Sequence, residues 1–332
     1  MRFSAVEKRL FCTTVLLLAL VLAGIHLLSD SNVSEDRSGN IIRVLPEMNM
    51  ELDQESTLEK LQLNSKLRTT EKIRREVKPT QVNNRRNISN SHNKDFIVVG
   101  IPTIERPKGT NYLEQTLDSL LTNRVNFDRV IFVVYIGDTD KNRVEKVKES
   151  ILEKHSKEVE KGLIHIIHPA ADIYPDWEKD MKITLGDPRR QVKWRSKQNL
   201  DQAYLMNYAY NLQPKYYLSL EDDVLAVENY LETIYKYAES EMKDDIIIIS
   251  YCKWGAIGKL FSAKFLPTLV QYLRTFWNYK PLDWLFSDLL HILACRYPPT
   301  NCEKDINSKK LDYPKELFEH KGMVSSLVKN TT

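Results

Sequence analysis

Three consecutive carboxylates, Glu221, Asp222 and Asp223, follow the apolar stretch 216–220, and an apolar pattern resumes at Val224. Carboxylates this close repel one another, and they are rarely left at the end of a buried strand without a neutralising cation. Mg²⁺ or Mn²⁺ fits this position, because such an ion needs few protein oxygens when a substrate phosphate supplies the rest. This acidic triplet therefore predicts a metal site that serves a bound nucleotide. The alternative is a solvated acidic turn.

The acidic triplet belongs to a region of alternating strands and helices that begins at Asp95. Continuous apolar runs, typical of parallel strands buried on both faces, occupy 96–101, 130–136, 163–167, 216–220 and 246–250. Helical patterns lie between these runs, at 112–121, 144–159, 191–210 and 264–279. This alternation predicts an α/β domain with a mostly parallel central sheet and helices on both faces.

Polar residues follow several of the predicted strands. Thr103 and Glu105 come after the first, Asp138 after the second, and the acidic triplet after a later one. In such sheets ligands bind beyond the carboxyl ends of the strands. We therefore expect a nucleotide pocket with the metal and diphosphate at Asp223 and with the base and ribose nearer Thr103, Glu105 and Asp138. Taken singly, each of these three is more often an ordinary polar loop residue.

Three common catalytic or nucleotide-binding motifs are missing from the sequence. It contains no G-x-G-x-x-G, no G-x-x-x-x-G-K-[ST] and no G-x-S-x-G. A dinucleotide-binding fold, a P-loop and a serine hydrolase are therefore not supported. Metal-assisted chemistry on a nucleotide diphosphate remains, which describes transfer from a sugar nucleotide.

The whole chain has 332 residues, of which 42% are hydrophobic, so it can hold one large domain or two small ones with appendages. Its net charge of +3 is too balanced to favour nucleic acid. The apolar run 10–28 is close to the length of a membrane span, with basic residues before it and acidic residues after it. This asymmetry predicts a type II signal anchor. A cleaved signal peptide is the alternative.

The segment 29–94 is polar and has no aromatic residue before Phe96, which predicts a stem rather than a folded core. Leucines recur at loosely helical spacing within 52–73, so this part is either a short self-associating helix or a solvated spacer. The predicted organisation is a cytosolic tail, a membrane anchor, a stem, a catalytic-type domain and a C-terminal tail at 1–9, 10–28, 29–94, 95–327 and 328–332.

Two kinds of modification are also predicted. N-glycosylation sequons begin at Asn32, Asn87 and Asn330, and they become acceptor sites if the chain faces a lumen. Cys295 and Cys302 flank a short loop that can close as a small disulfide ring.

Six short segments occur in the order found in one known family. They occupy 99–103, 192–201, 220–224, 255–261, 280–285 and 317–322. Together they resemble glycosyltransferase family 54, the N-acetylglucosaminyltransferase IV group, over about 95–327. The resemblance implies a GT-A fold in a Golgi type II membrane protein whose catalytic domain is lumenal. It also implies inverting transfer of N-acetylglucosamine from UDP-GlcNAc, usually with Mn²⁺, in β1,4 linkage to the α1,3-mannose arm of N-glycans.

This chemistry assigns roles to five carboxylates. A metal at Asp223 would neutralise the departing UDP, while Asp222 and Glu221 hold the ribose and the metal's water shell. Inversion by single displacement needs a base for the proton of the acceptor hydroxyl. Asp283, which we expect on a loop after a helix, is the candidate, and Asp288 is the reserve. A helix N-cap is the alternative role for Asp283.

Basic residues complete the expected site. Arg195 and Lys197 lie in the long helix before the acidic triplet, where their charges could face the diphosphate, although surface salt bridges are an equal alternative. His320 is expected to contact the metal or a phosphate, because GT-A folds often supply such a contact late in the chain. A structural role is the alternative for this histidine.

Two departures from the family pattern leave a second hypothesis open. The active members carry a lectin-like domain beyond the point at which this sequence stops, at Thr332, and they have Glu-Phe-Ser where this chain has Ser250-Tyr251-Cys252. The first hypothesis is a Golgi N-acetylglucosaminyltransferase. The second is an inactive relative that binds and modulates another Golgi glycosyltransferase, and a third keeps the enzyme but changes its acceptor.

Overall fold

The computed structural model describes residues 95–106, 110, 112–125, 127–297 and 301–322. The elements within these residues follow the chain in this order: β1 (Ile97–Thr103), α3 (Tyr112–Asn123), β2 (Val130–Ile136), α4 (Lys141–Glu160), β3 (Ile164–Ile167), η1 (Ala171–Ile173), α5 (Arg189–Asn211), β4 (Tyr216–Ser219), β5 (Val224–Ala226), α6 (Tyr230–Glu241), β6 (Ile248–Ser250), β7 (Lys259–Ser262), η2 (Ala263–Phe265), α7 (Leu266–Thr275), α8 (Leu282–Ala294), α9 (Cys302–Asn307), β8 (Lys310–Asp312) and β9 (Phe318–His320).

The main sheet has seven strands in the order β3-β2-β1-β4-β7-β6-β8. The first four are parallel to one another, β7 is antiparallel to both of its neighbours, and β8 is parallel to β6. All strands except β7 therefore point the same way. This confirms the predicted mixed α/β architecture with a mostly parallel central sheet.

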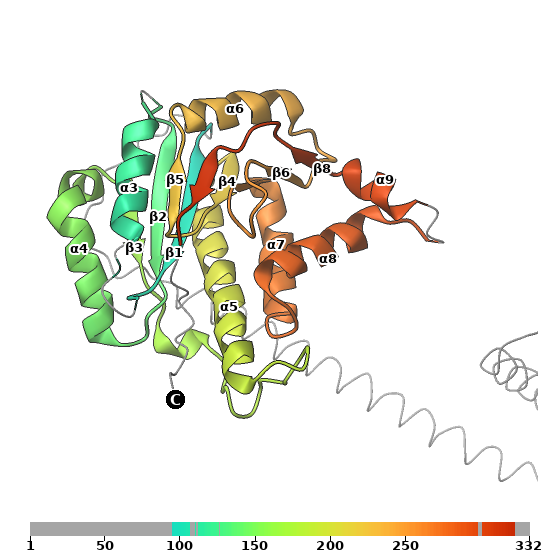
Figure 1. The fold of residues 1–332 in the computed structure, drawn as a ribbon, viewed down its shortest axis with the longest axis horizontal. Coiled ribbons are helices and arrows are strands. Elements are labelled where there is room, and N and C mark those ends of the chain that lie inside the picture. Colours follow the sequence, from blue (N-terminus) through green and yellow to red (C-terminus); the bar gives the residue numbers. More distant parts are fainter. Residues whose placement is uncertain (1–94, 107–109, 111, 126, 298–300, 323–332) are drawn as a thin grey trace, which may run out of the picture. The chain divides into compact units, whose positions relative to one another are not determined.

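Two apolar clusters cover the two faces of this sheet. Figure 1 shows the helices that contribute to them. Ile97, Val99 and Ile101 of β1 pack into the cluster that includes buried residues of α3 and α6. Val98 points to the opposite face, into the cluster with buried residues of α5, α7 and α8. Because successive side chains of a strand alternate between faces, a continuous apolar run is required when both faces are buried.

A second, two-stranded sheet forms beside the acidic triplet. In it β5 and β9 are antiparallel, with Val224 opposite His320. The backbone N–H of Lys321 then donates to the carbonyl oxygen of Asp223 over 2.8 Å. This pairing places β9 and the residues that follow it beside the acidic triplet.

Helix α8 corrects one expectation, because Asp283 lies in the first turn of a helix and not on a loop. The helix forms because its apolar residues recur at helical spacing, so that one side can be buried. These buried residues are Leu285, Phe286, Leu289, Leu290 and Ala294. The N-cap position is occupied by Pro281, so the alternative role of Asp283 as the N-cap is also wrong.

The end of α8 is joined to α9 by a covalent link. Cys295 and Cys302 are paired in a disulfide, with their Cα atoms 4.9 Å apart. The loop between them includes residues 298–300, which lie outside the described part.

Several predictions concern residues outside the described part of the chain. The anchor at 10–28, the stem at 29–94 and the sequons at Asn32, Asn87 and Asn330 all lie there, and they stay predictions together with the domain limits. Among the described residues, no helix combines the length and the apolar character that a membrane span requires.

Candidate functional site

The carboxyl ends of β1 and β4 lie side by side, with Gly100 opposite Ser219, so the segments that follow these strands converge. Asp222 occupies the meeting point and is only 5% exposed. Thr103 Oγ1 donates to its Oδ2 over 2.6 Å, and the guanidinium of Arg106 contacts its Oδ1. Both carboxylate oxygens of Asp222 are therefore engaged by residues that follow or end β1.

Thr116 of α3 fixes the backbone of the acidic triplet. Its Oγ1 donates to the carbonyl oxygen of Asp222 over 2.9 Å and accepts from the N–H of Val224 over 3.0 Å. One hydroxyl thus satisfies two buried backbone groups that the end of β4 would otherwise leave unpaired. The direction of the Asp222 and Asp223 side chains follows from this anchoring.

Asp223 differs from Asp222 in the state of its two oxygens. Its Oδ2 lies 3.1 Å from Arg106 Nη2, whereas its Oδ1 is buried and accepts no hydrogen bond from the described residues. His320 Nε2 is 3.4 Å from that same Oδ1. An unsatisfied buried carboxylate oxygen is costly, so this atom is well suited to a ligand or a cation.

Glu221, Asp223 and His320 form what we call the metal triad. Each offers one ligand atom, and the three atoms lie within 4.8 Å of one another. Two carboxylates and one imidazole suit Mn²⁺, and so few protein ligands leave positions for phosphate oxygens. The unpaired Asp223 Oδ1 is the observation that shows the fit.

The pKa of Glu221 shows that its surroundings disfavour a negative charge on its carboxylate. Burial raises the pKa of Glu221, and so do the negative charges of Asp223, Asp222 and Asp283, while Arg106 opposes them; the net result is a pKa of about 7. Burial also raises the pKa of Asp222. The influence of Asp283 places its carboxylate within electrostatic range of the metal triad.

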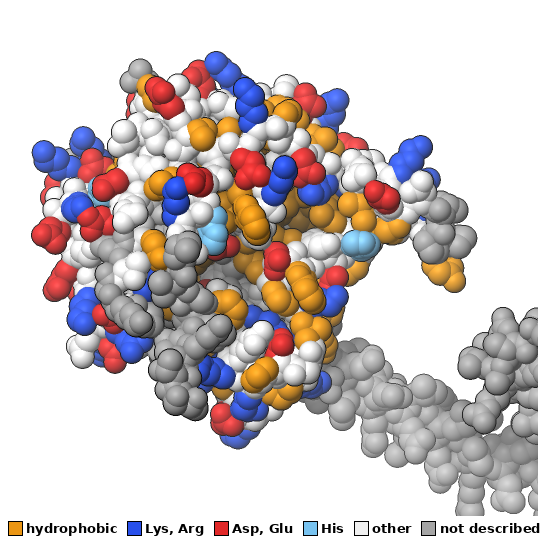
Figure 2. All heavy atoms as spheres, in the orientation of Figure 1, with side chains coloured by type: hydrophobic (Ala, Val, Ile, Leu, Met, Phe, Trp, Pro, Cys, Tyr) orange, Lys and Arg blue, Asp and Glu red, His pale blue; other side chains and the backbone are white. Residues whose placement is uncertain are grey.

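The two candidate bases have different surroundings. Asp283 is exposed at the start of α8, followed by the half-exposed Trp284. Asp288 forms an ion pair in which its Oδ2 lies 2.7 Å from Lys280 Nζ. In Figure 2, hydrophobic side chains gather over α8 beside a hollow whose border also carries acidic side chains. Only Asp283 is linked to the triad by the electrostatics of the described residues.

Gly322 closes the metal triad from the side of β9. A Cβ atom at this position would lie 2.1 Å from Asp223 Oδ2 and 2.9 Å from His320 Nε2. A methyl group cannot occupy that space unless both side chains move. The absence of a side chain at 322 is therefore a condition for the arrangement of the triad.

We expect Gly322→Ala to weaken Mn²⁺ binding by about tenfold or more, because the added methyl group pushes Asp223 and His320 apart. Binding is measured by electron paramagnetic resonance of free Mn²⁺, with thermal unfolding as a check on folding. Lys321→Ala is the control, because that side chain is exposed and pairs with Glu319. Unchanged binding in a folded Gly322→Ala protein would contradict the prediction.

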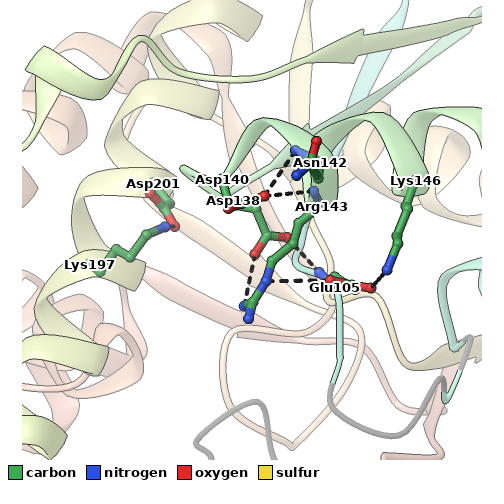
Figure 3. A network of polar contacts seen from close by, with 8 residues as sticks. All are labelled: Glu105, Asp138, Asp140, Asn142, Arg143, Lys146, Lys197 and Asp201. Atoms are coloured by element: carbon green, nitrogen blue, oxygen red, sulfur yellow. Dashed lines mark hydrogen bonds and ion pairs between the residues drawn. The ribbon is translucent and has the colours of Figure 1, made fainter.

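Asp138, at the end of β2, forms a second polar group with Glu105 (Figure 3). The backbone N–H of Glu105 donates to Asp138 Oδ2 over 2.6 Å, and burial raises the pKa of Asp138. The Glu105 carboxylate lies 3.0 Å from Lys146 Nζ and 3.5 Å from Arg143 Nε, both on α4. The structure thus brings Glu105 and Asp138 together, and the Glu105 carboxylate is paired with basic side chains of α4.

Lys197 lies on the other side of the β2 end, on α5 (Figure 3). Its Nζ is 2.6 Å from Asp201 Oδ2, and it sits 4.8 Å from the ring centre of Tyr174. Tyr135 and Tyr174 donate to Asp201 Oδ1 over 2.9 and 2.5 Å. The positive charge of Lys197 opposes part of the rise that burial causes in the pKa of Asp138, so Lys197 acts electrostatically on the region expected to hold the base and ribose.

Arg195 corrects another expectation, because it does not face the acidic triplet. It is 2% exposed and points into the protein, where it contacts Asp187 and donates to Thr184 Oγ1 over 2.6 Å. Its position on α5 directs it toward the segment that precedes this helix. Arg195 therefore anchors that segment and is not available to a diphosphate.

A small cavity lies beside this site. It has a volume of about 170 Å³ and is lined by residues of the β1 end, α3 and α4, including Thr103, Glu105, Arg106, Tyr112, Lys146 and Asp222. The cavity adjoins the expected position of the base and ribose, between Asp222 and Glu105.

Three residues of the site were missed by the sequence reasoning: Arg106, Thr116 and Gly322. Arg106 had a detectable signal, because it is a basic residue three positions after the end of β1, in the loop that faces the acidic triplet. Thr116 had no signal beyond its place in the predicted helix 112–121, and Gly322 had none beyond its place in the segment 317–322, since their roles depend on contacts across more than 90 residues of sequence.

The fold and the site together define an α/β protein with a mostly parallel sheet and a cluster of carboxylates and an imidazole beyond its strand ends, which is where such sheets bind ligands. The sequence-family model described as the MGAT4 conserved region matches residues 39–332 of this chain. The chain therefore belongs to the MGAT4 family, as the sequence motifs had indicated.

Curated relatives agree with this assignment. Over 244 residues the chain is 36% identical to alpha-1,3-mannosyl-glycoprotein 4-beta-N-acetylglucosaminyltransferase A of Bos taurus, covering 72% of this chain and 45% of the relative. It is 33% identical over 235 residues to the corresponding B enzyme of Danio rerio, covering 70% and 42%. The chain thus spans less than half the length of these relatives.

Solved structures show a weaker likeness. A mannosyltransferase from Pyrobaculum calidifontis in complex with GDP-Man and Mn²⁺ matches with a TM-score of 0.33 and 13% identity, over 52% of this chain and 46% of the other. S. aureus TarS 1–349 in complex with UDP-GlcNAc matches with a TM-score of 0.32 and 14% identity, over 55% and 53%. These scores are too low to add to the assignment.

Proposed function

We propose that the chain is a metal-assisted N-acetylglucosaminyltransferase with a GT-A fold. It transfers N-acetylglucosamine from UDP-GlcNAc, with inversion, in β1,4 linkage to the α1,3-mannose arm of N-glycans. Family membership supports the reaction type, and the names of the relatives support the sugar and the linkage. The observation that carries the proposal is the buried, unpaired Asp223 Oδ1 beside Glu221 and His320.

Glu221, Asp223 and His320 would hold the metal, which when bound stabilises the negative charge that develops on the departing UDP. In this structure, Thr103 and Arg106 occupy the oxygens of Asp222, so Asp222 is not among the residues proposed to hold the metal. Asp138 and Lys197 border the region proposed for the base and ribose.

The displacement itself needs a base for the acceptor. The acceptor hydroxyl oxygen forms a bond to C1 of the donor sugar while the bond from C1 to the UDP oxygen breaks, and the electron pair leaves with UDP. Asp283 takes the proton of the hydroxyl, because it is exposed and its charge reaches Glu221. A single displacement of this kind inverts the configuration at C1.

The cellular setting is also part of the proposal. We propose a single-pass type II protein of the Golgi membrane, with the described domain in the lumen and N-glycans of glycoproteins as acceptors. The apolar run 10–28 and its flanking charges support this arrangement.

One observation favours the second candidate, an inactive relative that modulates another Golgi N-acetylglucosaminyltransferase. Ser250 ends β6 in place of the carboxylate of the family pattern, and the buried Lys259 donates to its Oγ over 2.6 Å and contacts the carbonyl oxygen of Cys252. Lys259 is thus satisfied by neutral groups, and burial lowers its pKa. By the resemblance, the active members have a carboxylate here, so this chain lacks a negative charge that they are expected to carry.

The test is turnover of UDP-GlcNAc by the full chain in detergent, with Mn²⁺ and a panel of N-glycan acceptors, and with the product identified by mass spectrometry. A β1,4-linked product on the α1,3-mannose arm is expected. A folded protein that binds UDP and Mn²⁺ but transfers no sugar would overturn the enzyme proposal. Co-purification of such an inert protein with a Golgi branching enzyme would then favour the second candidate.

A further inference from the structure

We propose that Arg106 is a built-in cation that competes with the metal, so that metal binding becomes coupled to nucleotide binding. The inference rests on the metal site of the proposed function, and it holds whether or not sugar is transferred. It assigns a role to a residue outside the metal triad.

The contacts of Arg106 place it against the ligands of the metal. Its Nη2 contacts Asp222 Oδ1 and lies 3.1 Å from Asp223 Oδ2. The side chain is 9% exposed, so water screens these contacts poorly. One guanidinium nitrogen thus bridges two adjacent carboxylates, one of which belongs to the metal triad.

The charges explain why this arrangement opposes the metal. The acidic triplet contributes three carboxylates, and Arg106 already neutralises part of their charge in the free protein. A divalent cation at the metal triad would share Asp223 with Arg106. Like charges held this close repel one another strongly in a poorly solvated site. Metal alone should therefore bind weakly.

A nucleotide diphosphate changes this balance. Its phosphate oxygens can accept from a guanidinium, which binds phosphate as readily as carboxylate. Arg106 also has space into which it can turn, because it lines the cavity beside Asp222 together with Tyr112, whose ring centre lies 4.9 Å from its guanidinium. When Arg106 turns to phosphate, Asp223 is left to the metal. The two ligands then strengthen each other's binding reciprocally.

The experiment measures Mn²⁺ affinity of the full chain by electron paramagnetic resonance, with and without UDP, in wild type, Arg106→Met and Arg106→Lys. In the absence of UDP, Arg106→Met is expected to bind Mn²⁺ about tenfold more tightly than wild type, because the competing charge is gone. UDP should strengthen Mn²⁺ binding less in Arg106→Met than in wild type. Arg106→Lys keeps the charge and should stay close to wild type.

Arg129→Met is the matched control, because Arg129 is exposed and lies over the Tyr235 ring, away from the acidic triplet. Its Mn²⁺ affinity should not change. Unchanged or weaker Mn²⁺ binding in a folded Arg106→Met protein would overturn the inference. So would equal tightening in Arg106→Lys, because that variant retains the charge.

These outcomes are separate from those that test the proposed function. If wild type binds Mn²⁺ in the presence of UDP but Arg106→Met shows no tightening, only the inference about Arg106 fails. If neither protein binds Mn²⁺ under any condition, the metal site of the proposed function fails as well. Transfer activity is not needed for either conclusion.

Discussion

Replacement of Asp223 by Asn is expected to lower the kcat/KM of sugar transfer by about a thousandfold, roughly 4 kcal/mol of transition-state stabilisation. The reason is the buried Oδ1 of Asp223, which accepts no hydrogen bond from the described residues and faces His320 Nε2 at 3.4 Å. An amide has the same shape but lacks the negative charge that a divalent cation requires. Mn²⁺ affinity should fall with activity, because one residue serves both.

The control for this substitution is Asp312→Asn. Asp312 also lies at the end of a strand, β8, but it is exposed and pairs with Lys310 over 3.1 Å. Steady-state transfer with saturating UDP-GlcNAc and increasing Mn²⁺ measures the effect. Wild-type kcat/KM in a folded Asp223→Asn protein would refute the assignment of Asp223 as the central metal ligand.

The second large effect is expected for Asp283→Asn, which should reduce kcat by about a hundred- to ten-thousandfold, the usual contribution of a general base. Asp283 is exposed at the start of α8, and its charge reaches the metal triad. It does not belong to the triad. The affinities for UDP and Mn²⁺ should therefore stay near wild type while turnover is lost.

Asp288→Asn supplies the matched comparison, because it makes the same chemical change five residues along the same helix. Asp288 is paired with Lys280, so its loss should alter turnover little. Turnover with a fixed acceptor, beside UDP binding by calorimetry, separates the two variants. If Asp288→Asn were the more damaging of the two, the base would be Asp288 and the assignment of Asp283 would be wrong.

The family of the protein, its α/β class and the position of the acidic triplet were all readable from the sequence. Strands buried on both faces need continuous apolar runs, and the run 130–136 coincides with β2. The order of polar residues after successive strands also indicated which edge of the sheet carries the site. These signals are local, since each depends on a few neighbouring residues.

The direction of single side chains was not readable in this way. The buried side of α5 includes polar residues such as Arg195, Asn199 and Gln202. The sequence therefore shows no purely apolar face that would indicate which side of this helix faces the core. Arg195 was therefore expected at the diphosphate and is found beneath the segment around Thr184. Asp283 was likewise expected on a loop, because the burial of one side of α8 depends on its tertiary partners.

By itself, the sequence determined that three carboxylates follow a buried strand, and it predicted a cation beside them, because the strand pattern and the charge repulsion are local properties. Only the tertiary structure decided which side chains lie against these carboxylates. It pairs β9 with β5 so that His320 meets Asp223, and it folds the β1 loop back so that Arg106 bridges Asp222 and Asp223. Those contacts join residues about a hundred positions apart, and they follow from sheet pairing and packing that no short stretch of sequence contains.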